Sequence, residues 1–143
     1  MPSELLQVAD AVVAALKGAE LSQEFEAQRL YRPEFELPEM ATLHVTVVPK
    51  GIEVKPEARG KATYEYKVDV GVQKRFEKGD ATELDPLMQL VEEIAGLFRL
   101  SRLAAFPQAV WVKTEHAPVF APEHMEGLRQ FTSILTFTFR VVR

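Results

Sequence analysis

Cysteine is absent from this chain of 143 residues, and histidine occurs only three times. The absence of cysteine excludes disulfide scaffolds, thiolate zinc sites, iron–sulfur clusters and cysteine nucleophiles. No apolar run is long enough to span a bilayer, so no membrane partner is expected. The first 19 residues lack the basic leader of a signal peptide and carry Glu4 and Asp10 instead, so we expect no secretion by that route.

A strong charge of either sign is also missing, because the formal net charge is only -4. Proteins that grip nucleic acid through its phosphates present a broad basic surface, which this balance does not favour. The chain length fits a single domain over residues 1–143 that buries about two thirds of its unfolded surface.

What the chain does have is one unusually long strand pattern between Ala62 and Phe76, where apolar and polar residues alternate. An extended run of this length measures about 45–50 Å at about 3.3 Å per residue. A globule of this chain length is about 35–40 Å across. We therefore expect part of the strand to project as an arm that completes its hydrogen bonding on another copy of the chain.

The first half of the chain predicts a helix, two shorter strands and this long strand. Helical spacing of apolar residues begins after Ser3, a capping residue, and ends at Gly18. A short strand is expected between Glu24 and Arg32, followed by a surface loop over Pro33–Met40. We also expect a strand over Leu43–Val47 that is closed by Pro49 and Gly51, and a polar loop over Lys50–Lys61 that tips the arm.

The second half predicts a helix and two strands. Asp85 followed by Pro86 is a typical start for a helix, whose buried stripe runs to Phe98. The short alternating segment Val110–Lys113 predicts a strand, and Ala117–Gly127 a loop. Alternation from Phe131 to Val141 predicts the last strand.

The resulting order, α-β-β-β-α-β-β, has neighbouring strands rather than strict alternation of strands and helices. This order favours an α+β fold. We expect a mainly antiparallel sheet with both helices packed on one face and a projecting β-hairpin arm.

The sequence offers little material for chemistry. His116, Glu123 and His124 are chemically competent for zinc or manganese, but their spacing fits no recurrent ligand motif and solvated loop residues are the alternative. The adjacent pair Glu92 and Glu93 would point about 100° apart on a helix and does not converge. We therefore predict no catalytic, cofactor-binding or metal-binding residue, and no enzyme activity.

Three segments, together with the order of elements, resemble small neck and tail proteins of phages and prophages. They are VDVGVQKRF (Val68–Phe76), LDPLMQLVEEIAGLF (Leu84–Phe98) and FTSILTFTFRVV (Phe131–Val142). The chain is most similar in architecture to the tail terminator, or tail-completion, proteins of long-tailed bacteriophages. No catalytic or ligand-binding motif contributes to this resemblance.

The resemblance implies a structural protein of the virion. It implies a homohexameric ring that caps the tail tube, stops tube polymerisation, and forms the docking surface for the head connector. DNA would pass through the lumen without specific binding. The protein would lie in the tail or neck of the particle, and in the host cytoplasm during assembly.

Two sets of residues are the expected subunit or tube contacts, with a solvated loop as the alternative for each. Those at the arm tip are Lys50, Lys55, Arg59 and Lys61, and those in the later loop are Phe120, His124 and Met125. Three other functions stay open at this point: a head-completion or stopper protein, a small metal-binding enzyme built around the histidine cluster, and a module that binds a peptide at a sheet edge.

Overall fold

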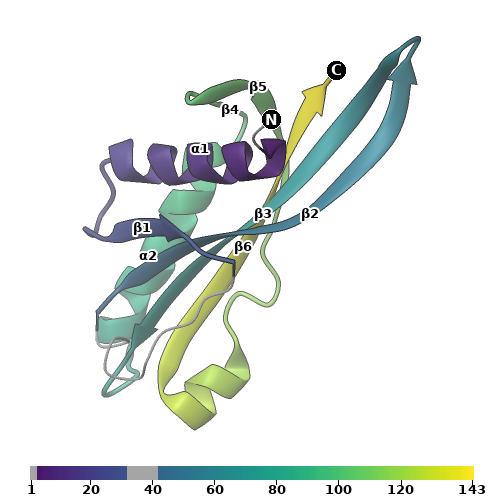
Figure 1. Ribbon diagram of the computed structural model, residues 1–143. Helices are drawn as coiled ribbons and strands as arrows, with labels where there is room; N and C mark the ends of the chain where they lie inside the picture. The colour runs from purple at the N-terminus through teal and green to yellow at the C-terminus, as the bar shows by residue number, and fades with distance from the viewer. Residues whose placement is uncertain (1–2, 32–41) are drawn as a thin grey trace.

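Two helices cover one face of a six-stranded sheet in the computed structural model of the protein, which describes residues 3–31 and 42–143 (Figure 1). The helices are α1 (Glu4–Gly18) and α2 (Ala81–Phe98), and the strands are β1 (Glu26–Arg29), β2 (His44–Ala58), β3 (Lys61–Arg75), β4 (Arg102–Leu103), β5 (Phe106–Glu115) and β6 (Gln130–Val142). The sheet order is β1-β2-β3-β6-β5-β4, with only β1 and β2 parallel. The predicted α+β class and mainly antiparallel sheet are confirmed.

The core lies between the helices and alternate residues of β3 and β6. Val68 lies opposite Phe137 in the ladder, and Tyr66 lies opposite Phe139. All four side chains are buried. Phe98, at the end of α2, places its ring 4.8 Å from that of Phe137. The alternation seen in the sequence therefore separates a helix-covered face from a second, more polar face.

Helix α1 has the predicted limits. The side chain of Ser3 accepts a hydrogen bond from the Leu6 N–H, and the last helical residue is Gly18.

Helix α2 begins earlier than predicted, so the assignment of Asp85 and Pro86 to its start is wrong. Asp80 is the N-cap and accepts a hydrogen bond from the Glu83 N–H. Pro86 lies inside the helix, where it lacks the N–H that would donate to the carbonyl of Thr82. The helix therefore starts at the Asp80 cap, and Pro86 lies within it without ending it.

The limits predicted for β2 are also wrong. The strand does not close at Pro49 and Gly51 but continues to Ala58, so most of Lys50–Lys61 is strand rather than a polar loop. The ladder with β3 shifts its register between Pro49 and Gly51, as a β-bulge does. Proline is tolerated here because, among the described residues, this part of β2 is an edge with no second strand to which a backbone N–H would donate.

Other limits differ in smaller ways. The strand expected over residues 24–32 is only Glu26–Arg29, whereas the one expected at Val110–Lys113 extends over Phe106–Glu115. The short strand β4 and a π-helical turn, η2 (His124–Leu128), were not predicted. The loop expected at Pro33–Met40 lies outside the described residues.

The hairpin of β2 and β3 extends beyond the helices, as predicted for the arm (Figure 1). Strand β6 accompanies β3 along this path, pairing from Gln130 to Val142. The arm is therefore backed by a third strand. Within the described parts of the chain, we find no helix with both the length and the apolarity that crossing a membrane requires.

Candidate assembly surface

The part of the hairpin from residue 51 to residue 66, here called the arm, exposes large apolar side chains. Ile52 is 54% exposed and Val54 is 53% exposed. They lie opposite Tyr66 and Tyr64 in the ladder, so they extend the core-facing side of the sheet into solvent. Ile52 and Val54 are thus the large apolar side chains that the arm exposes.

One edge of the arm has free backbone groups. Strand β1 pairs with β2 only from His44 to Val47, and the Leu30 N–H donates to the Val47 carbonyl. Beyond that point, residues 48–58 have no strand on their outer side within the described part of the chain. An edge of this kind is a template on which another strand can pair.

The tip of the arm is a tight turn with two cations. Gly60 has a φ of 70°, a conformation that glycine adopts at little cost, and Arg59 and Lys61 flank it. Lys55 lies behind the tip, with its Nζ 3.4 Å from Oε1 of Glu53 and 3.9 Å from Oε1 of Glu65.

Lys50 is not at the tip, contrary to the prediction that grouped it there. It follows Pro49 at the bulge, 3.6 Å from Asp69 and 3.4 Å from the hydroxyl of Thr136. The Thr136 hydroxyl also donates to Asp69. Lys50 therefore belongs to a polar network on the face of the sheet away from the helices.

The base of the arm is held to α1 by polar contacts. The hydroxyl of Tyr66 lies 2.5 Å from Oε1 of Glu4, and Nε of Arg143 lies 3.2 Å from the same oxygen. The guanidinium of Arg143 also covers the ring of Tyr64 at 4.3 Å. Burial, with the hydrogen bond to Glu4, raises the pKa of Tyr66 to about 12. These contacts join the base of the arm to the first turn of α1 and to Arg143.

The residues predicted in the later loop lie in different environments. Phe120 is 39% exposed. His124 opens η2, with Nδ1 2.8 Å from the hydroxyl of Thr132. Met125 packs against the hydrophobic core. Of the three, Phe120 offers the most open apolar surface, and the set is separate from the arm tip.

The histidines considered for a metal site each contact a hydroxyl on β6. Nε2 of His116 is 2.7 Å from Oγ of Ser133, whereas His124 contacts Thr132. Neighbouring residues of a strand point to opposite faces. Across residues 3–31 and 42–143, the fold brings together no group of three or more potential metal ligands.

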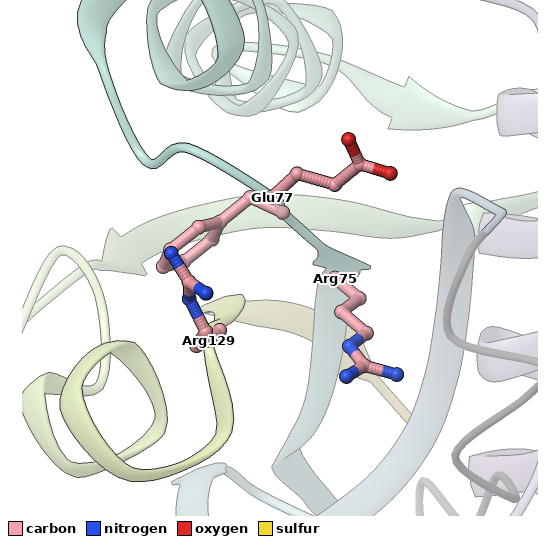
Figure 2. Close-up of a pocket in the computed structure, with 4 residues that line it drawn as sticks. Arg75, Glu77 and Arg129 are labelled. Carbon is pink, nitrogen blue, oxygen red and sulfur yellow. The ribbon is translucent and has the colours of Figure 1, made fainter.

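A hollow of about 430 Å³ lies at the end of β3 opposite the arm tip. It is lined by Arg75, Phe76, Glu77 and Arg129. Figure 2 shows that the charged ends of Arg75, Glu77 and Arg129 point in different directions. They do not converge on a common ligand position.

Sequence reasoning missed Ile52 and Val54, the apolar residues of the arm. The signal was present, because Ile52 and Val54 repeat the alternation of Leu43–Val47, displaced by one residue. It was hidden by the one-residue shift at the bulge, which changes which positions face the helices.

Comparison with known proteins finds a likeness in structure only. No protein-family profile and no curated protein sequence matches the chain. Among solved structures, the chain is similar to the sheath/tube terminator of an extracellular contractile injection system, PVC, determined by cryo-EM in the extended state. The TM-score is 0.53 at 14% sequence identity. The likeness covers 100% of this chain and 58% of the terminator chain, so the protein has the fold of part of a sheath/tube terminator.

Proposed function

We propose that this protein is a structural terminator that caps the tube of a phage-like tail or contractile injection particle. The observation that carries the proposal is the likeness to a sheath/tube terminator across the whole chain. The exposed apolar arm with its free strand edge is the kind of surface that such an assembly role requires. The role needs no catalytic residue, cofactor or metal.

The ring is a further part of the proposal. A projecting arm that contacts the next copy makes a head-to-tail interface, and such interfaces close into rings when the rotation between copies allows it. We propose a homohexamer that contacts the tube protein on one side and the head connector, or an equivalent particle component, on the other. The lumen would let DNA or another cargo pass without specific binding.

The test measures mass and tube binding on the same samples. Light scattering coupled to size exclusion, across protein concentration, is expected to give a discrete species of six subunits. Addition of the particle's tube protein is expected to give a capped complex, with tube growth arrested. A head-completion protein would instead bind the portal side and leave tube growth unchanged.

A variant of the arm tests the surface. Ile52→Ser together with Val54→Ser is expected to weaken assembly while leaving the free energy of unfolding within about 0.5 kcal/mol, because both side chains are already exposed. Leu100→Ser is the matched control, because Leu100 is exposed but lies outside the arm. Unchanged assembly of the double variant would contradict a role for the arm.

A further inference from the structure

Opposite sides of the molecule carry surfaces of opposite charge. One is the arm tip, at residues 59–61. The other is a hollow of about 560 Å³ between the end of α1 and the start of β1, here called the α1–β1 hollow. It is lined by Leu16, Lys17, Ala19, Glu20, Leu21, Gln23, Glu24 and Phe25.

The tip of the arm is basic, although the arm as a whole is neutral and the chain is acidic overall. Residues 51–66 contain three basic and three acidic side chains, a formal charge of 0, whereas the whole chain carries -4. Glu53 and Glu65 lie within 4.0 Å of Lys55, and Glu57 accepts a hydrogen bond from Thr63. The tip cations Arg59 and Lys61, in contrast, form no ion pair with any described residue.

The α1–β1 hollow has the complementary character. The residues that line it include one basic side chain, Lys17, and two acidic ones, Glu20 and Glu24, a formal charge of -1. Glu20 and Glu24 are exposed at the hollow and form no ion pair within the described part of the chain. Leu21 and Phe25 are half-buried between them. The hollow therefore combines apolar lining with two carboxylates, and the arm tip presents the two cations Arg59 and Lys61.

The hollow is held in shape before any partner arrives. The Ser22 N–H donates a 2.9 Å hydrogen bond to Oε1 of Glu93, and Nε2 of Gln23 donates a 3.0 Å hydrogen bond to the carbonyl of Pro86. Both acceptors belong to α2, so the segment between α1 and β1 is fixed to a rigid element. A preformed site loses less conformational entropy on binding.

The two surfaces cannot meet within one molecule. Figure 1 shows the arm tip on one side of the molecule and the connection from α1 to β1 on the other. Only a second copy can bring them together, and that contact is head-to-tail. We propose that the arm tip of one copy docks in the α1–β1 hollow of the next, with Arg59 and Lys61 facing Glu20 and Glu24. This inference rests on the proposed self-assembly and adds the identity of the two contacting surfaces.

Charge reversal tests the docking. Arg59→Glu with Lys61→Glu, and separately Glu20→Lys with Glu24→Lys, are each expected to weaken self-association by about tenfold or more, because like charges would face each other. An equal mixture of the two variants is expected to assemble again, with the variants alternating. Glu92→Lys with Glu126→Lys is the control, because it makes the same charge change at exposed carboxylates outside the hollow.

Disulfide trapping tests the contact directly, since the natural chain contains no cysteine. A copy with Arg59→Cys is mixed with a copy with Glu24→Cys under oxidising conditions. Disulfides form only where Cα atoms approach to about 4.4–6.8 Å, so a cross-linked heterodimer is expected. Lys78→Cys in place of Glu24→Cys is the control and is expected to give no heterodimer.

The outcomes separate this inference from the proposed function. Assembly and tube capping that persist through charge reversal, without a cross-link, would overturn the docking and leave the terminator role standing. A wild-type chain that stays monomeric at every concentration, without a cross-link, would overturn the docking and the self-formed ring together. Trapping of the arm in the hollow without tube capping would support the docking and contradict the terminator role.

Discussion

The hydroxyl of Tyr66, on β3, lies 2.5 Å from Oε1 of Glu4 in the first turn of α1. These residues are 62 positions apart in the chain, and their hydrogen bond ties the base of the arm to the helical layer. The ring of Tyr66 is buried, and the hydrogen bond of its hydroxyl to Glu4 is partly shielded from water.

Replacement of Tyr66 by phenylalanine removes this hydrogen bond and keeps the ring. We expect a loss of about 1.5–3 kcal/mol in the free energy of unfolding, because the acceptor is a carboxylate. Urea denaturation gives the value. Tyr64→Phe is the control and is expected to change stability by less than about 0.5 kcal/mol, because the hydroxyl of Tyr64 bonds to no described residue. Equal losses in the two variants would contradict the assigned bond.

Titration of Tyr66 should make stability depend on pH in alkaline solution. The pKa of Tyr66 rises from 10.0 to about 12 on folding, so the folded chain holds its proton more tightly than the unfolded chain. The resulting stability is complete below pH 10 and is lost as pH rises toward 12. Ultraviolet absorbance of tyrosinate in the wild type minus Tyr66→Phe is expected to show one group titrating near pH 12. A difference centred at pH 10 would contradict the shift.

Two glycines with similar backbone angles should differ in their tolerance of alanine. Gly60 and Gly79 have φ values of 70° and 72°, but a Cβ at Gly60 would meet open space, whereas one at Gly79 would lie 2.7 Å from the ring of Phe76. We expect Gly60→Ala to cost about 1 kcal/mol from backbone strain alone. Gly79→Ala should cost about 1–3 kcal/mol more, because Phe76 must move. Thermal unfolding of both variants measures the difference.

The turn before α2 should loosen in acid. The carboxylate of Glu83 accepts hydrogen bonds from the N–H groups of Glu77, Lys78 and Gly79, and these bonds lower its pKa from 4.5. A depressed pKa contributes stability above the unfolded value that is lost as pH falls through the folded value. Hydrogen exchange of these three amides is therefore expected to accelerate below about pH 4.5 relative to the rest of the chain.

A neutral substitution provides the control for that experiment. Glu83→Gln keeps an oxygen acceptor but removes the charge, so the same three amides should exchange faster than in the wild type at neutral pH. Their protection should then show no acid transition of its own. An acid transition that survives in Glu83→Gln would assign the effect to another carboxylate.

Local patterns predicted the core of the sheet well. Strands β3 and β6 alternate cleanly because one face packs on the helices, and Ser3 marks the start of α1 through its own side chain. Strand β2 was cut short in the prediction because Pro49 and Gly51 are strand breakers in most contexts. At the edge of a sheet, beside a β-bulge, Pro49 and Gly51 do not end the strand. Whether a strand lies at an edge depends on the tertiary fold.

The α1–β1 hollow could not be predicted from sequence. The hydrogen bond from Ser22 to Glu93 joins residues 71 positions apart, so no local sequence pattern predicts it. The cations at Arg59 and Lys61 were visible as charges in the sequence. The structure shows that Lys50 lies beside Asp69 and that Lys55 lies beside Glu53 and Glu65. Arg59 and Lys61 have no such carboxylate partner among the described residues, which the sequence alone could not show.

The last strand of the chain lies in the middle of the sheet, between β3 and β5. During synthesis, the strands on either side leave the ribosome before the strand that joins them. The inner edges of β3 and β5 keep open hydrogen-bonding groups until β6 emerges, so the sheet cannot close before β6 has been synthesised. Until then, the unpaired edges of β3 and β5 are open to pairing with strands of other chains.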